Sequence, residues 1–139
     1  VSILHLFRVE PGKGDDALTE IFSTTLSAGI LIRACFGERD MKDRRGACHD
    51  EYDFSGTVSL DPTPANGMPR FVVQTLATTY PGDVSRNGDS LANGPLKKSD
   101  LVRKRREDCS YRRIFTYIPE QGGYAPDTEL PDCSEFTVP

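Results

Sequence analysis

Two histidines are the side chains of this sequence that titrate near neutral pH, and they raise the question of catalysis. His5 lies in an apolar run, and His49 lies in a densely charged one. Two imidazoles acting as acid and base suffice for a metal-independent ribonuclease when a cation holds the phosphate. Arg33, Arg44, Arg45 or the basic run at 97–113 could supply that cation. A core or edge position explains His5 equally well, and a surface position explains His49, so this enzyme is an alternative hypothesis.

The other catalytic and metal-binding patterns in the sequence do not indicate an activity more strongly than the two histidines do. His49, Asp50, Glu51 and Asp53 could provide nitrogen and oxygen ligands, but their spacing matches no Ca²⁺ loop or zincin pattern. The sequence contains no Gly-x-Ser-x-Gly, P-loop or dinucleotide fingerprint. Gly12-Lys13-Gly14 could hold an anion at a helix start, although a plain turn explains it too. We therefore expect neither a metal nor a cofactor.

The basic residues are concentrated in one run. Residues 97–113 contain eight basic and three acidic side chains, a net charge of +5, whereas the whole chain has −4 and a pI near 5.2. The acidic balance of the chain argues against a nucleic-acid partner. The eight basic residues are Lys97, Lys98, Arg103, Lys104, Arg105, Arg106, Arg112 and Arg113.

Three interpretations of this basic run stay open. It could bind a protein partner, together with Arg44 and Arg45 in the charged segment 37–53. Arg103-Lys104-Arg105-Arg106 also has the Arg-x-Arg-Arg form that subtilisin-like proprotein convertases of the secretory pathway recognise. Alternatively, the acidic tail folds back over the run as a solvated ion-pair network that adds little net stability.

The four cysteines indicate a protein stabilised by disulfide bonds. None lies in a Cys-x-x-Cys pair, and no two histidines have zinc-finger spacing, which argues against structural zinc. An even, sparse set fits two disulfides in a secreted protein. We favour Cys35–Cys48 and Cys109–Cys133, because each closes a loop inside one half of the chain. Four reduced thiols in a cytosolic protein are the alternative.

The elements that must position these residues begin with a predicted β-α-β unit. Residues 2–9 are rich in β-branched and aromatic side chains and end at a Pro-Gly turn. Asp15 is placed as a helix N-cap, and Leu18, Ile21, Phe22, Thr25 and Leu26 recur at helical steps after it. Residues 30–36 resemble a second strand. These patterns together predict that a helix between two strands forms the centre of the fold.

The rest of the chain predicts further strands and loops. Alternation favours a strand at 52–60, and Asn66-Gly67 predicts a hairpin corner before a strand at 70–80. We expect a mobile loop at 81–95, a short basic helix at 96–107, a strand at 110–118, and a Pro- and Gly-rich acidic tail at 119–139.

Together these elements predict one α+β domain over residues 1–139. A small two-layer sandwich of the split β-α-β, or ferredoxin-like, type fits their order. No apolar run is long enough to span a membrane. Because the sequence starts at Val1 rather than Met, we expect a trimmed or mature chain.

Two resemblances extend this picture. The run Leu6-Phe-Arg-Val-Glu-Pro-Gly-Lys-Gly-Asp-Asp-Ala-Leu18 resembles the first strand-to-helix passage of small dimeric α+β-barrel proteins, which include cofactor-free monooxygenases. That likeness implies a cofactor-free enzyme as a further alternative. As a whole, with its four cysteines and its Arg103–Arg106 run, the chain is similar in kind to small secreted effectors and killer toxins of fungi. This second resemblance implies a secreted, non-catalytic protein that binds a protein target in another organism. The oligomeric state is left open.

Overall fold

The chain folds mainly as β-strands. The computed structural model describes residues 1–12 and 17–139. Its strands are β1 (Ser2–Val9), β2 (Leu18–Arg33), β3 (His49–Ala65), β4 (Met68–Tyr80), β5 (Lys104–Arg105), β6 (Arg112–Ile118) and β7 (Gly123–Pro126). The helices are short: α1 (Glu38–Asp43), α2 (Ser134–Thr137) and the 3₁₀ turns η2 (Lys98–Asp100) and η3 (Glu107–Cys109).

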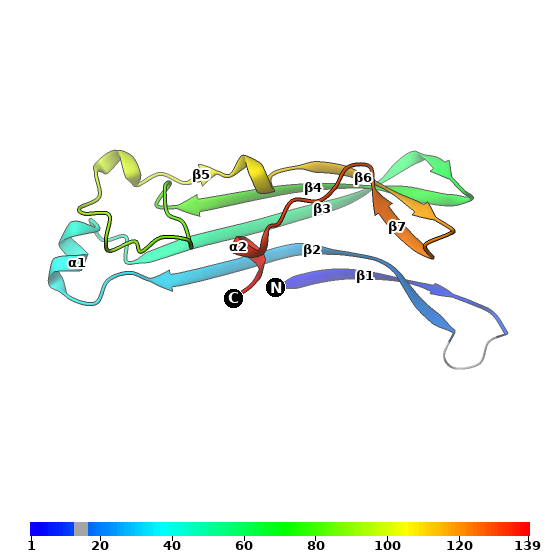
Figure 1. Cartoon of the computed structure of the whole chain (residues 1–139), viewed down its shortest axis with the longest axis horizontal. Coiled ribbons are helices and arrows are strands. Elements are labelled where there is room, and N and C mark those ends of the chain that lie inside the picture. Colours follow the sequence, from blue (N-terminus) through cyan, green and yellow to red (C-terminus); the bar gives the residue numbers. More distant parts are fainter. Residues whose placement is uncertain (13–16) are drawn as a thin grey trace.

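The described strands form one antiparallel sheet. Their order is β1-β2-β3-β4-β6-β7, with β5 paired to β4, so neighbours in the sheet are near neighbours in the sequence. Every pairing is antiparallel, and the sheet curls into a half-barrel. Figure 1 shows the long strands β2, β3 and β4 running along the molecule, with α1 at one end and α2 lying over the middle.

The predicted β-α-β start, and with it the α+β sandwich, is wrong. The segment expected to be a helix is β2, a strand of 16 residues. Its first half pairs with β1, where Leu6 faces Phe22, and its second half pairs with β3, where Ala28 faces Phe54. Pairing on both sides and burial of apolar side chains outweigh the helical spacing. Asp15, the predicted cap, and Lys13 and Gly14 of the predicted anion loop lie outside the described residues.

Several other elements agree with the predictions. Asn66 and Gly67 form the corner between β3 and β4, and both have positive φ (56° and 72°), as a type I′ hairpin turn requires. The strands predicted at 2–9, 70–80 and 110–118 correspond to β1, β4 and β6. The helix predicted at 96–107 is wrong, because this segment contains η2 and the short strand β5. The Arg106 N–H donates to the Ala77 carbonyl (2.8 Å), which holds the end of the segment against β4.

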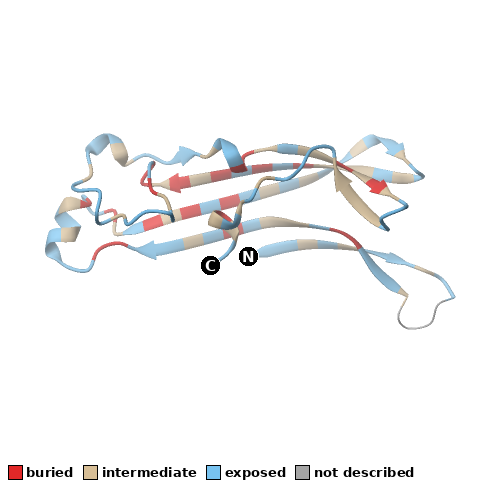
Figure 2. Ribbon diagram, viewed as in Figure 1, coloured by how far each residue is buried: buried red, intermediate tan, exposed pale blue. Residues whose placement is uncertain are grey.

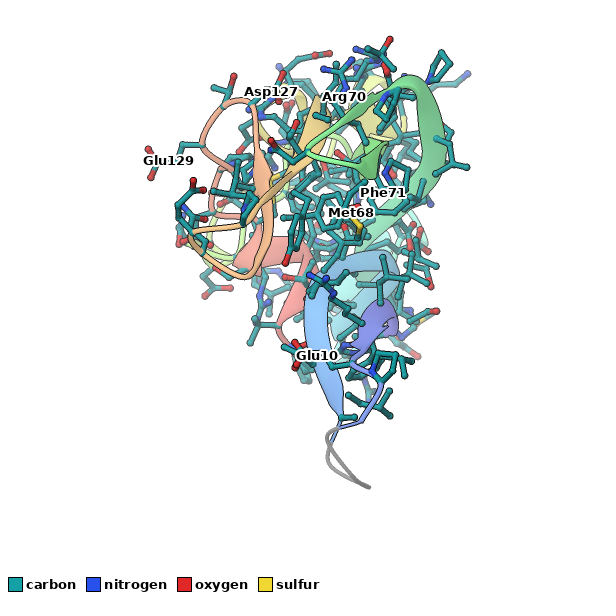
Figure 3. The ribbon with its side chains drawn as sticks, turned by 90° about the vertical axis from the view of Figure 1, so that its right-hand side faces the viewer. Glu10, Met68, Arg70, Phe71, Asp127 and Glu129 are labelled. Carbon is teal, nitrogen blue, oxygen red and sulfur yellow. A yellow bond between two sulfur atoms is a disulfide. The ribbon has the colours of Figure 1, made fainter. Side chains whose placement is uncertain are left out.

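The core has two parts. The first, under α2 and the segments around residues 84 and 109, contains Ala28, Tyr52, Phe54, Ala77, Val84, Cys109 and Phe136. The second, in the curl of the sheet, contains Phe22, Val73 and Phe115, with Phe71 and Tyr124 packed against them. Buried residues alternate with less buried ones in the first part of β3 (49–54) and the second part of β4 (73–79), as expected for strands with one covered face (Figure 2). Figure 3 looks onto the end where the second part lies, with Met68 beside Phe71.

Both predicted disulfides are confirmed. Cys35–Cys48 closes the loop that contains α1, and Cys109–Cys133 ties η3 to the start of α2. The segment predicted as a Pro- and Gly-rich tail, residues 119–139, contains the strand β7 and the helix α2. No helix among the described residues is long and apolar enough to cross a membrane.

The loop at 81–95 packs on the rest of the molecule. Arg86 donates from Nη1 to the Glu135 carbonyl (3.2 Å) and to the Val138 carbonyl, and Ser90 donates to the Asp50 carboxylate. These bonds join the loop to the tail and to β3. Its mobility stays a prediction.

Candidate functional site

The two histidines do not form a common site. His5 lies opposite Ser23 and His49 lies opposite Arg33 on the same strand β2. Ten residues of strand separate these two positions, a distance of roughly 33 Å. The structure therefore does not bring together the acid and base that the ribonuclease hypothesis needs.

His5 has a carboxylate partner of its own. Its Nδ1 contacts the Glu20 carboxylate, and the two side chains are 48% and 44% exposed. Ser23 is the register partner of His5, but no hydrogen bond joins the Ser23 hydroxyl to the ring in the described part of the chain.

The central arginines and lysine of the basic run are engaged in ion pairs. Arg103 contacts Glu51 and Asp53 on β3, the latter at 2.6 Å, and its guanidinium lies 5.6 Å from the centre of the Tyr80 ring. The remaining pairs are Lys104–Asp83 (2.9 Å), Arg105–Glu107 (3.0 Å), Arg106–Asp108 (4.0 Å) and Arg106–Glu135 (3.6 Å). Only the last of these reaches the acidic tail, so most partners of the run come from elsewhere in the chain.

The other predicted contact residues are either bound or buried within the fold, or exposed to solvent. Arg113 donates to the carbonyl oxygens of Thr128 (3.2 Å) and Glu129 (3.3 Å) and lies 5.1 Å from the centre of the Tyr111 ring. Arg112 is exposed on β6. Arg44 is 2% exposed, which leaves it no surface for a partner.

The acidic side chains of the segment 49–53 form ion pairs within the fold. Asp50 pairs with Arg44, and Glu51 and Asp53 pair with Arg103. Within residues 1–12 and 17–139, no group of three or more His, Cys, Asp or Glu side chains is arranged to hold a metal ion.

The two segments predicted as contact surfaces meet at one end of the molecule. The Leu96 N–H donates to the Asp43 carbonyl (2.8 Å), and Arg45 Nε donates to the Leu96 carbonyl (2.9 Å). These bonds place Lys97 and Lys98 beside the loop that Cys35–Cys48 closes. We call this surface, made of residues 31–45 and 96–98, the basic end; its exposed cations are Arg33, Arg39, Lys42, Arg45, Lys97 and Lys98.

Two of the three acidic residues of the basic end are engaged in local contacts. Asp40 accepts a hydrogen bond from the Phe36 N–H (2.9 Å), and Asp43 lies 3.8 Å from the Arg39 guanidinium. Glu38 begins α1. Six exposed cations against these three acids leave the surface positive, unlike the chain as a whole.

Large apolar side chains accompany these cations. Leu31, Phe36 and Met41 are 67%, 68% and 54% exposed. The Arg33 guanidinium lies 5.5 Å from the centre of the Phe36 ring, within the range of a cation–π contact. Arg33, Phe36 and Met41 border a hollow of about 580 Å³ that reaches back to the Cys35–Cys48 disulfide and His49.

Sequence reasoning missed the apolar part of this surface. It placed Phe36 at the end of a strand, which made burial the natural expectation. The signal that could have found it is the order Cys35-Phe36-Gly37, because a disulfide followed by glycine ends the strand and starts a loop. No protein-family model, no curated protein and no solved structure matches this chain.

Proposed function

We propose that this protein is a secreted, disulfide-stabilised binding protein that holds an acidic and partly apolar surface of a protein target at its basic end. The observation that carries the proposal is the exposure of Phe36 and Met41 on the loop that Cys35–Cys48 closes, among six exposed cations. That the target belongs to another organism, as the resemblance to effectors implies, is part of the proposal.

The composition of the basic end supports this function. Aromatic residues, methionine and arginine are enriched at the centre of protein interfaces, and the rim is polar and solvent-accessible. Phe36, Met41 and Arg33 supply the first kind, and Lys97 and Lys98 lie at the side. Acidic partner groups complement the positive charge and accelerate association.

The disulfide supports it in a second way. A loop already held in one conformation loses less conformational entropy on binding than a free loop does. Cys35–Cys48 and the backbone bond between Ala34 N–H and the Cys48 carbonyl (2.9 Å) fix both ends of this loop. Disulfides also persist in oxidising compartments, which fits secretion.

Selection from a random peptide library displayed on phage tests the proposal without knowledge of the target. We expect enriched peptides that combine acidic and apolar residues. Their binding should weaken at least tenfold in the variant Phe36→Ser/Met41→Ser and in the variant Lys97→Glu/Lys98→Glu, since each removes one half of the recognised chemistry. A biosensor titration of synthetic peptides gives the dissociation constants.

Matched variants elsewhere on the sheet provide the control. Leu76 is 44% exposed on β4 and Arg112 is exposed on β6, so Leu76→Ser and Arg112→Glu change the same chemistry away from the basic end. Equal weakening by these controls would contradict the proposal. So would enriched peptides without acidic residues, or equally tight binding of a single-stranded RNA at the basic end.

A further inference from the structure

A cavity of about 450 Å³ lies between the end of β2, the start of β3 and the loop at 85–91. Ile32, Phe36 and Leu91 give it apolar walls, Arg33 and Arg86 contribute guanidinium groups, and Tyr52 lines it from β3. The volume is that of a site for a small organic molecule.

The hydroxyl group of Tyr52 has no hydrogen-bond partner among the residues that the structure describes. Its side chain is 0% exposed, and among the described residues its oxygen is the buried side-chain atom without a hydrogen-bond partner. Its ring packs edge-on against Phe136, with 6.1 Å between ring centres. Buried hydroxyls in folded proteins are nearly always hydrogen-bonded, so an unpaired one that lines a cavity indicates a missing partner.

The other polar groups of the cavity already have partners. Asp50 is paired with Arg44 and accepts a hydrogen bond from Ser90. Asp89 accepts from the Leu91 N–H (2.9 Å). The side-chain bonds of Arg86 to the tail leave from Nη1 alone, and a guanidinium has five N–H groups. Tyr52 and Arg86 thus retain donors, whereas the carboxylates are occupied.

These donors define the ligand. Burial raises the pKa of the Tyr52 hydroxyl to about 12, with Asp50 and Glu135 adding to the shift, so the group stays protonated and donates at neutral pH. A hydroxyl and a guanidinium together match the oxygens of a carboxylate, and Arg33 adds a second positive charge. Ile32, Phe36 and Leu91 match an apolar body.

We propose that this cavity binds a small organic monocarboxylate with an aromatic or branched aliphatic body, whose carboxylate accepts hydrogen bonds from the Tyr52 hydroxyl and the Arg86 guanidinium. Because Tyr52 is shielded from solvent, the loop at 85–91 shifts to admit the ligand. The site does not depend on target binding at the basic end, although Arg33 and Phe36 belong to both surfaces.

Titration of 3-phenylpropionate against the ¹⁵N-labelled full chain, followed by NMR, tests this site. We expect shifts in Ile32, Leu91 and Tyr52 amides and a dissociation constant below about 1 mM, the range accessible to a ligand of this size. Its neutral amide, 3-phenylpropanamide, should bind at least tenfold more weakly, because it lacks the charge that Arg33 and Arg86 attract.

The variant Tyr52→Phe separates the site from the fold. It should weaken 3-phenylpropionate binding at least tenfold while the thermal midpoint stays the same or rises, since the lost hydroxyl has no partner in residues 1–12 and 17–139 of the free protein. Tyr111→Phe, in a half-buried tyrosine away from the cavity, should leave binding unchanged. Equal binding by Tyr52→Phe and the natural chain, equal binding of acid and amide, or no shift in the lining residues at any accessible concentration would overturn the proposal.

Discussion

The guanidinium of Arg44 and the carboxylate of Asp50 form an ion pair from which water is almost excluded, since each side chain is 3% exposed. Arg44 also donates from Nε to the Ala47 carbonyl (2.8 Å), and Asp50 accepts from the Ser90 hydroxyl. The pair therefore joins the residue that follows α1, the start of β3 and the loop at 81–95. It is a structural element beneath the basic end.

Loss of one partner of this pair should be costly. Arg44→Met leaves the Asp50 carboxylate buried without its counter-charge, and we expect the free energy of unfolding to fall by about 3–5 kcal/mol. Urea denaturation followed by circular dichroism measures the change. Arg45→Met, at the exposed neighbour, should cost less than about 1 kcal/mol.

The double variant Arg44→Met/Asp50→Leu distinguishes charge from packing. Apolar residues at both positions remove the unpaired charge, so the double variant should be more stable than Arg44→Met alone. An Arg44→Met variant that is as stable as Arg45→Met would show that the pair contributes nothing.

Gly56 should not tolerate a side chain. A Cβ at this position would lie 2.8 Å from the Thr25 carbonyl oxygen, at the point where β2 leaves the β3 pairing that begins at Ser27. We expect Gly56→Ala to lower the free energy of unfolding by about 1–3 kcal/mol, because backbone must move to relieve the clash. Gly37→Ala is the control: it has open space around it and an extended φ of −166°. Equal urea midpoints for the two variants would contradict this account.

The strands of the sheet show which parts of the fold could be predicted from the sequence and which could not. Strands were predictable where β-branched and aromatic residues ended at clear turns, as in β4 and at Asn66-Gly67. In β2, Ile21 and Phe22 are adjacent and both are buried, because β7 comes close to Ile21 while Phe22 faces the second part of the core. Two adjacent buried residues imitate a helical face, and only the partner strands resolve the ambiguity.

The candidate site shows a similar limit. Local sequence identified the disulfide pairing and the charged segments that meet at the basic end. It could not show that Arg44 is buried against Asp50 while its neighbour Arg45 is exposed, because the difference depends on contacts with β3 and the loop. The unpaired hydroxyl of Tyr52 likewise has no signature in the sequence, since hydrogen-bond partners are set by tertiary packing.

The Arg-x-Arg-Arg motif should resist cleavage in the folded chain. Lys104 and Arg105 pair with β4, and the Arg106 N–H donates to the Ala77 carbonyl (2.8 Å). A convertase must draw the segment into its own cleft, which requires local unfolding of these bonds. Intact mass spectrometry after incubation with a proprotein convertase should show an uncut native chain and a urea-unfolded chain cut after Arg106.

A rapid cut in the native chain would contradict that expectation and revive the processing hypothesis. Each disulfide lies wholly on one side of the Arg106–Glu107 bond, so neither would hold the two pieces together. The partner of β4 in the sheet, β6, would then stay attached by noncovalent contacts alone.

Tyr52 should make the fold sensitive to alkaline pH. Burial, with Asp50 and Glu135, raises the pKa of its hydroxyl from 10.0 to about 12. The unfolded chain therefore releases this proton at lower pH than the folded chain does. This group therefore leaves the free energy of unfolding unchanged below about pH 10 and lowers it as the pH rises toward 12, by at most about 3 kcal/mol. Urea midpoints from about pH 9 to pH 11.5 measure it. The variant Tyr52→Phe lacks this ionisation and keeps all others, so its free energy of unfolding should fall less steeply above pH 10. Parallel pH curves for the two proteins would instead show that Tyr52 has its ordinary pKa in the folded chain.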